Sequence, residues 1–262
     1  MLFGAITGDI VGSIYEFRNI KTKDFPFFPA SGYITDDSCM TIAVAKALID
    51  WKRTGGDLQQ LTIEAMRDLG AKYPHMGYGH GFARWLISEN PEPYNSWGNG
   101  AAMRISAAGW VGQSITEVKR LSYMVTAVTH DHIEGIKGAE ATAVAIFLAR
   151  TGKSKEEIAR YITRNYYDWC SSVDELQANY SWDGSCQGTV PPALQCFFES
   201  ESFEDAIRNA ISIGGDSDTI GAITGAVAEA FYGIPDKILE TTKTYIPEDL
   251  MQIILDFEKT FK

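Results

Sequence analysis

The residues in this sequence best suited to chemistry lie in two short acidic stretches. Residues 216–219 read Asp-Ser-Asp-Thr, follow a pair of glycines and precede a small, apolar segment expected to be a helix. Residues 35–38 read Thr-Asp-Asp-Ser and also precede an apolar run. Clustered carboxylate and hydroxyl oxygens are hard ligands, which suit Mg²⁺ or Mn²⁺ rather than zinc.

Each stretch also has a simpler explanation. Asp, Ser and Thr cap helix N-termini by accepting hydrogen bonds from free N–H groups. For residues 216–219 alone, capping and metal binding explain the pattern equally well. The second stretch of the same composition favours metal, because four carboxylates brought together repel strongly unless cations neutralise them. One cation or a pair would do this, and a pair of metal ions is a known hydrolytic device.

The composition limits the class of protein. The chain has 262 residues with ordinary globular composition, and a net charge of −11 argues against broad binding of a nucleic-acid backbone. The four cysteines form no Cys-x-x-Cys pair, so a zinc ribbon is not expected. The first residues lack the basic region of a signal peptide, and no apolar run is long enough to span a membrane. We therefore expect a cytoplasmic monomer with no stable nucleic-acid or membrane partner.

The first helix is expected to position part of the site. It carries three glycines spaced four apart, at Gly4, Gly8 and Gly12. On a helix this spacing forms a smooth stripe that lets another backbone approach closely. The helix over 216–232 has its own stripe of small residues, so we expect the two to pack together. That contact would bring Asp9, expected as a buried supporting or capping residue, and Glu16, at the end of the first helix, toward residues 216–219.

Other segments are helical or form loops near the site. Residues 95–100 form a polar, glycine-rich loop before a helix over 101–108; such a loop can cradle phosphates, although on its own a plain turn explains it better. Pro191 and Pro192 are expected to begin a helix, and residues 165–190 to form a loop. Strand alternation is scarce. We predict an all-α fold, a single-domain orthogonal bundle of about a dozen helices spanning residues 1–262.

Five stretches, in order along almost the whole chain, resemble the motifs of the ADP-ribosylglycohydrolases, which include the dinitrogenase reductase-activating type and the ADP-ribosyl-acceptor hydrolases of animals. They lie at residues 8–16, 35–37, 96–104, 129–130 and 214–220. Two departures are small: Trp97 stands where the family usually has tyrosine, and Ser38 where it often has threonine.

The resemblance implies an all-α enzyme that uses two Mg²⁺ or Mn²⁺ ions to cleave the glycosidic bond between ADP-ribose and an acceptor. The substrate would be an ADP-ribosylated protein or a small conjugate. The implied metal ligands are Thr35, Asp36, Asp37, Asp216, Asp218 and Thr219. The implied catalytic residues are Glu16, Asp36 and Asp37. The implied residues for binding ADP-ribose are Ser96, Trp97, Gly98, Asn99, Gly100 and His130, with Trp97 covering a ring of the nucleotide.

Two alternatives stay open from the sequence. The family includes crystallin-like relatives, so the chain is alternatively a silent binder of metal and ADP-ribose. Asp216-x-Asp218 also imitates the nucleophile motif of haloacid-dehalogenase-like phosphohydrolases, although that fold needs an apolar strand before the motif and a parallel sheet. The acceptor is equally open between arginine, serine, nucleic acid and a metabolite.

Overall fold

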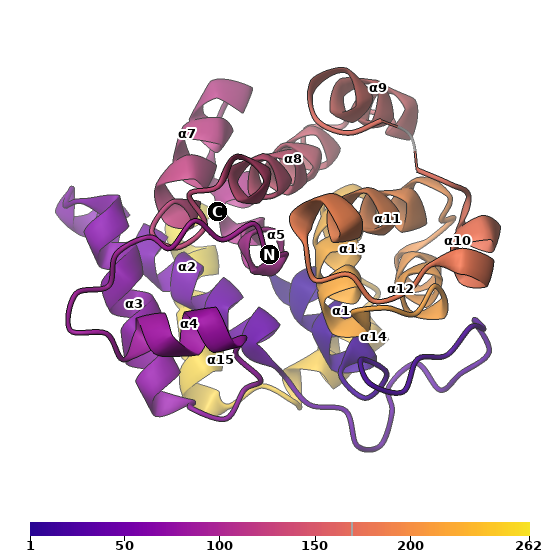
Figure 1. Ribbon diagram of the computed structural model, residues 1–262, viewed down its shortest axis with the longest axis horizontal. Helices are drawn as coiled ribbons and strands as arrows, with labels where there is room; N and C mark the ends of the chain where they lie inside the picture. Colours follow the sequence, from indigo (N-terminus) through magenta and orange to yellow (C-terminus); the bar gives the residue numbers. More distant parts are fainter. Residues whose placement is uncertain (169) are drawn as a thin grey trace.

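All regular secondary structure in the computed structural model, which describes residues 1–168 and 170–262, is helical (Figure 1). No strand occurs among these residues, and the only pairing of that kind is an isolated bridge between Gly98 and Ser185. The prediction of an all-α fold is confirmed. The phosphohydrolase alternative is wrong, because its parallel sheet is absent from the described part of the chain.

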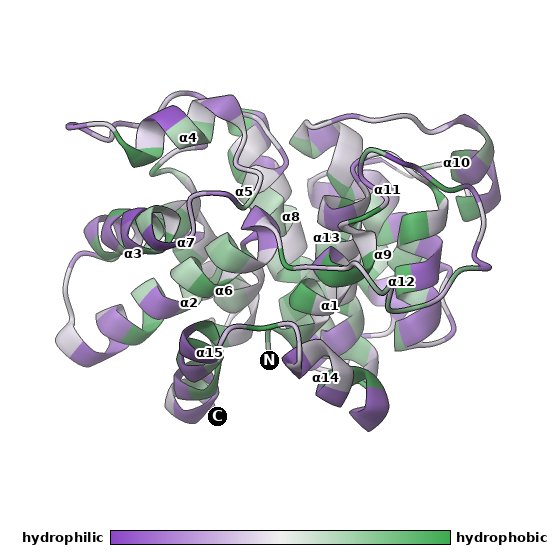
Figure 2. Ribbon diagram, turned by 90° about the horizontal axis from the view of Figure 1, so that it is seen from below, coloured by the Kyte–Doolittle hydropathy of each residue, from purple (hydrophilic) through white to green (hydrophobic). Residues whose placement is uncertain are grey.

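The described residues form fifteen helices, where about a dozen were predicted. In chain order they are α1 Phe3–Gly12, α2 Asp36–Thr54, α3 Leu58–Lys72, α4 His80–Leu86, α5 Gly100–Met103, α6 Ser106–Val111, α7 Ile115–Thr126, α8 Ile133–Arg150, α9 Lys155–Asn165, α10 Val173–Asn179, α11 Cys186–Phe198, α12 Phe203–Ser212, α13 Ser217–Tyr232, α14 Asp236–Lys243 and α15 Glu248–Phe261. Apolar residues concentrate on α1 and on the inward faces of its neighbours (Figure 2). Among the described residues, no helix combines the length and apolarity needed to cross a bilayer.

The helices α1 and α13 pack backbone to backbone at the centre of the molecule (Figure 1). A Cβ atom added to Gly8 would lie 1.9 Å from the carbonyl oxygen of Gly221, and one added to Gly4 would lie 2.2 Å from that of Gly225. The predicted contact between the two small-residue stripes is therefore confirmed. The amino group of Met1 also donates to Glu258 Oε1 at 2.6 Å. These contacts join the two ends of the chain and support our proposal that residues 1–262 form one domain.

Replacing Gly8 by alanine is expected to destabilise the protein by about 1–3 kcal/mol or more, the usual cost of overpacking a core. The added methyl group meets backbone atoms, which cannot rotate away as a side chain does. Urea unfolding measures the change. Gly79→Ala is the matched control, since no atom lies within 4 Å of a Cβ there. Equal stability of the two variants would contradict the close packing of α1 and α13.

The structure corrects four details of the predicted elements. The helix α1 ends at Gly12, so Glu16 lies in the turn beyond it rather than at its end. The helix expected over 101–108 is broken between α5 and α6, and α10 lies within the expected loop over 165–190, of which residue 169 falls outside the described residues.

The fourth correction concerns the two prolines, which lie inside α11 rather than at its start. Ser185 caps this helix by accepting a hydrogen bond from the N–H of Gly188. Pro192 has no N–H to satisfy the carbonyl of Gly188, four residues earlier. The hydroxyl of Tyr180 donates to that carbonyl instead, at 3.0 Å. A tertiary contact thus compensates for the missing bond and lets the helix begin before the prolines.

Candidate active site

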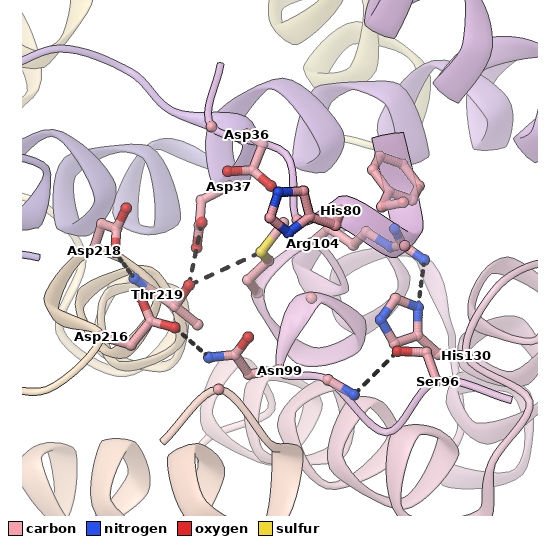
Figure 3. Close-up of a pocket in the computed structure, with 18 of the residues that line it drawn as sticks. Asp36, Asp37, His80, Ser96, Asn99, Arg104, His130, Asp216, Asp218 and Thr219 are labelled. Atoms are coloured by element: carbon pink, nitrogen blue, oxygen red, sulfur yellow. Dashed lines mark hydrogen bonds between the residues drawn. The ribbon is translucent and has the colours of Figure 1, made fainter. Parts of the chain in front are cut away.

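A cavity of about 300 Å³ lies between the N-terminal ends of α2 and α13 and the loop that precedes α5. Figure 3 shows the carboxylates of the two acidic stretches on one side of it, and Ser96, Arg104 and His130 on the other. The cavity therefore has an acidic end and a loop end. Of the predicted site residues, those lining it are Glu16, Asp36, Asp37, Ser96, Gly98, Asn99, Gly100, His130, Asp216, Asp218 and Thr219.

The acidic end joins residues far apart in the sequence. One carboxylate oxygen each from Glu16, Asp216 and Asp218 lie within 4.8 Å of one another, close enough to share a metal ion. The hydroxyl of Thr219 donates to Asp37 Oδ2 at 3.2 Å and so connects the two acidic stretches directly. Their convergence was predicted. The approach of Glu16 to residues 216–219 was also predicted, although Glu16 was expected as a catalytic residue and not among the implied metal ligands.

Asp9 holds the first acidic stretch in place from below. Its buried carboxylate accepts from the N–H of Thr35 at 2.9 Å, from the Thr35 hydroxyl at 2.8 Å and from the N–H of Ser38 at 3.1 Å. The Ser38 hydroxyl donates to it as well. Asp9 thus satisfies the free N–H groups at the start of α2, as predicted for a supporting residue. Asp36 and Asp37 are left to face the cavity.

Thr35 caps α2 and does not line the cavity. Its hydroxyl accepts from the N–H of Asp37 at 3.2 Å and donates to Asp9 Oδ1 at 2.8 Å. A hydroxyl has one hydrogen and two lone pairs, so one lone pair is uncommitted. Thr35 therefore retains the capacity to act as a ligand, and its assignment to the metal site stays a prediction.

Capping explains only part of the second acidic stretch, in which Asp218 Oδ1 accepts from the N–H of Thr219 at 2.9 Å. Asp216 occupies the N-cap position of α13, but its side chain accepts no hydrogen bond from that helix. It accepts instead from the Asn99 side-chain amide at 2.7 Å, across the cavity floor (Figure 3). Asp37 Oδ1 is buried and has no hydrogen-bond partner. Because an unpartnered buried carboxylate oxygen is costly, these side chains are better explained as ligands than as caps.

Burial and mutual repulsion oppose the ionisation of these carboxyl groups. Burial, followed by the charges of Asp9 and Asp216, raises the pKa of Asp36 to about 7. Burial and then Asp216 and Asp9 likewise raise the pKa of Glu16 to about 7. The pKa values of Asp37 and Asp218 are raised well above the ordinary aspartate value, again mainly by burial. The site is therefore built to receive positive charge.

The residues present fit divalent cations. Several carboxylates converge with a threonine hydroxyl, and Asp37 Oδ1 has no hydrogen-bond partner among the residues that the structure describes. Mg²⁺ and Mn²⁺ prefer such oxygen ligands. The residues that would hold the metal are Glu16, Thr35, Asp36, Asp37, Asp216, Asp218 and Thr219.

The stability of the metal-free protein should fall as the pH rises. The pKa values of Asp36 and Glu16 are about 7 in the folded protein, against 3.8 and 4.5 as ordinary values. Between these limits the folded state binds more protons than the unfolded chain, so raising the pH favours unfolding. Mg²⁺ binds the ionised carboxylates and should stabilise the fold more at high pH than at low pH.

Thermal unfolding with EDTA or with Mg²⁺, compared at about pH 5.5 and about pH 8, measures both effects. We expect the metal-induced rise in Tm to be larger at the higher pH. A rise of the same size at both values would show that the carboxyl groups titrate as ordinary surface acids.

His130 is held at the loop end as a neutral donor. Burial and the charge of Arg104 keep the pKa of His130 well below its ordinary value. Arg104 Nη2 lies 3.2 Å from His130 Nδ1, and arginine can only donate, so Nδ1 is the acceptor and the hydrogen lies on Nε2. A Cβ atom on Gly100 would lie 3.3 Å from Nε2. This N–H therefore faces the glycine-rich loop.

The loop end is fixed through a second loop. The N–H of Asn99 donates to the carbonyl of Gly184 at 2.8 Å, and the N–H of Cys186 donates to the carbonyl of Trp97 at 2.9 Å. The Ser96 hydroxyl accepts from the N–H of Gly98 at 3.2 Å. These hydrogen bonds hold the backbone of the loop in place, and they use the N–H groups of Gly98 and Asn99.

Trp97 lies apart from the other predicted residues of this loop. It is not among the residues lining the cavity; its ring is 51% exposed and lies 5.3 Å from that of His132, centroid to centroid. The role of Trp97 in covering a nucleotide ring stays a prediction.

Sequence reasoning missed four residues of the cavity wall, His80, Phe82, Tyr94 and Trp182, and it assigned no role to Met103 and Arg104. Arg104 belongs to one of the recognised motifs, and its guanidinium lies 5.2 Å from the ring centroid of Phe82. Trp182 comes from the segment read as a loop, where no periodic signal marks a site.

Comparison with known proteins gives consistent results. The sequence profile of the ADP-ribosylglycohydrolases matches residues 1–261. The chain is 26% identical to the ADP-ribosylhydrolase ARH3 of Homo sapiens, over 95% of this chain and 90% of that protein. It is 25% identical to the ADP-ribosylarginine hydrolase Tri1 of Pseudomonas putida, over 89% of this chain and 70% of that protein. A solved structure described as an ADP-ribosylglycohydrolase-related protein complex superposes with a TM-score of 0.72 at 21% identity, covering 100% of this chain and 98% of that one.

Proposed function

The chain belongs to the ADP-ribosylglycohydrolase family, and from this premise we propose that it is a metal-dependent hydrolase that releases ADP-ribose from an acceptor. The acceptor would be a protein side chain or a small conjugate. We also propose that it acts as a monomer.

The observation that carries this proposal is the two-ended cavity. Its acidic end gathers Glu16 and the two aspartate pairs, while its loop end carries Ser96 and the Nε2 hydrogen of His130. Asn99 connects the ends, because it lies in the loop and donates to Asp216 at 2.7 Å. A ligand with a diphosphate and a hydroxylated sugar complements both ends. ADP-ribose has this composition.

In the reaction, a bond forms between a water oxygen and the anomeric carbon of the ribose, and the bond from that carbon to the acceptor breaks. The water loses a proton and the acceptor takes one. Bound divalent cations would supply charge for orienting the ribose hydroxyls and acidifying water. The carboxyl group of Glu16, whose pKa burial raises in the metal-free protein, is placed at the acidic end to accept or donate a proton.

A panel of defined conjugates tests the proposal. Arginine-linked, serine-linked and nucleobase-linked ADP-ribose are incubated with the protein and Mg²⁺, and released ADP-ribose is quantified. We expect hydrolysis of at least one conjugate, abolished by EDTA and restored by Mg²⁺ or Mn²⁺. Calorimetry with free ADP-ribose serves as the second measurement. Binding of ADP-ribose without hydrolysis of any conjugate would favour the alternative, a catalytically silent binder of metal and ADP-ribose.

A further inference from the structure

A second, open hollow adjoins the acidic end of the cavity. The residues that line it are Glu16, Phe17, Asn19 and Trp182. Glu16 and Trp182 also line the main cavity, so the two spaces are continuous at these side chains. The proposed function places the diphosphate at the loop end and the ribose at the acidic end. The hollow beyond Glu16 is then the space into which the acceptor extends.

Two large aromatic side chains in this hollow are exposed. Phe17 is 84% exposed and Trp182 is 58% exposed. Aromatic surface left open to water beside a cavity is characteristic of a binding site. Both rings are free to contact a ligand without any rearrangement of the core.

The turn that carries Phe17 is held firmly. The Asn19 side-chain amide donates to the carbonyls of Glu16 at 3.0 Å and Gly215 at 2.8 Å, and its oxygen accepts from the N–H of Gly215 at 2.8 Å. These bonds fix the turn against the backbone that precedes Asp216. Phe17 thus keeps a set position relative to the carboxylates although its ring is exposed.

Trp182 is positioned by its own loop. A Cβ atom added to Gly184 would lie 2.7 Å from the indole atom Cη2, so the ring lies directly over the Gly184 backbone. The carbonyl of Gly184 in turn accepts from the N–H of Asn99 at 2.8 Å. The indole is therefore tied to the same loop that forms the far end of the cavity.

The charge around this hollow favours a cation. Glu16 is the only ionisable group among the four lining residues, and its carboxylate adjoins those of Asp216 and Asp218. The nearby ammonium group of Lys21 donates to the carbonyls of Tyr180, at 2.7 Å, and Ile213. An anionic acceptor would meet negative charge here. Although Arg18 is exposed in the same turn, a planar cation would gain from the Glu16 carboxylate and from the two aromatic faces.

We propose that Phe17 and Trp182 form the acceptor subsite and select a planar cationic group, the guanidinium of an ADP-ribosylated arginine side chain. This inference rests on the proposed function and specifies its substrate. A serine-linked conjugate presents no planar group to the rings, and a neutral nucleobase lacks the charge that Glu16 would attract.

Steady-state kinetics on the arginine-linked and serine-linked conjugates tests the subsite. We expect kcat/KM of the wild type to favour the arginine conjugate. Phe17→Ala and Trp182→Ala should each lower it by about 3- to 30-fold on that conjugate, the range expected for losing a cation–π contact, and by less than about twofold on the serine conjugate. Phe17→Leu, which keeps the apolar volume but removes the ring, should behave like Phe17→Ala.

Tyr123→Ala is the matched control, because Tyr123 is an aromatic residue of α7 with 51% of its surface exposed. It should leave both conjugates unaffected. Equal losses on both conjugates in the Phe17 and Trp182 variants would overturn the inference, as would a wild-type preference for the serine or nucleobase conjugate.

A binding measurement separates this inference from the proposed function. Agmatine, a free guanidinium compound, is titrated into the protein with ADP-ribose present, and the Trp182 indole N–H is followed by NMR. Its signal is assigned by its loss in Trp182→Phe. A shift that is absent in Phe17→Ala supports the subsite even if no conjugate is hydrolysed, in which case only the proposed function fails. An unmoved signal overturns the subsite.

Discussion

Replacing Asp218 by asparagine is expected to abolish the response of the protein to Mg²⁺ and to lower hydrolysis by more than about 100-fold. Substituting residues that merely support metal ligands typically weakens binding by ~10–100-fold, so losing a ligand should weaken it further. Asp218 is buried, and one of its carboxylate oxygens lies within 4.8 Å of those of Glu16 and Asp216. Asparagine keeps the shape of the side chain but removes the charge.

The same substitution should not destabilise the metal-free protein. Burial, and then the charges of Asp37 and Asp216, hold the pKa of Asp218 well above its ordinary value. At neutral pH the Asp218 carboxyl group therefore destabilises the folded state. Replacing it with a neutral amide should raise the Tm in EDTA. We expect Asp218→Asn to melt at or above the wild-type temperature in EDTA and to gain little from Mg²⁺.

Asp68→Asn, which changes an exposed carboxylate on α3, is the control for a general effect of charge. It should keep both the activity and the stabilisation by Mg²⁺. Unchanged metal affinity in Asp218→Asn, measured by calorimetry, would show that this aspartate serves the helix terminus rather than a cation.

Replacing Glu16 by glutamine should lower turnover by ~10²–10⁴-fold, the usual contribution of a general acid or base. Burial and the neighbouring carboxylates Asp216 and Asp9 raise the pKa of Glu16 to about 7, which suits proton transfer near neutral pH. Glutamine preserves the size and hydrogen bonding of the side chain but cannot transfer the proton. ADP-ribose binding, measured by calorimetry, should be largely kept.

Two controls make this result specific. Glu240→Gln alters a carboxylate of α14 that is 70% exposed and should leave turnover unchanged. Mg²⁺ titration of Glu16→Gln separates a loss of metal from a loss of proton transfer, because saturating metal restores the first and not the second. If turnover at saturating Mg²⁺ stayed within about threefold of wild type, well below that range, the proton-transfer role would pass to another carboxylate.

The sequence alone determined the class of fold and most of the acidic site. Residues 35–38 and 216–219 consist of Asp, Ser and Thr, which can bind a cation and which also favour the start of a helix. Their chemistry and their local structure could therefore both be predicted. The glycine spacing in α1 predicted its contact with α13, because a stripe without side chains on a helix has few uses other than close packing. Asp9, on the same helix, was correctly expected to be a buried supporting residue.

Only the tertiary structure decided the features of the site that depend on where a side chain points rather than on which residue is present. The turn after Gly12 carries Glu16 into the carboxylate cluster, and it is Asn19 that fixes this turn through Gly215. Neither contact follows from a periodic pattern, because a turn has none.

Tertiary contacts also decide which of two tryptophans lines the cavity. Trp97 belongs to a recognised motif yet lies against His132, while Trp182 lines the cavity from a segment without any pattern. The backbone bonds between residues 97–99 and 184–186 set which side chains of these two loops face inward. A sequence specifies that an aromatic residue is present in a loop. The side to which it points follows from hydrogen bonds to a partner loop far away in the chain, and these exist only once the helices have packed.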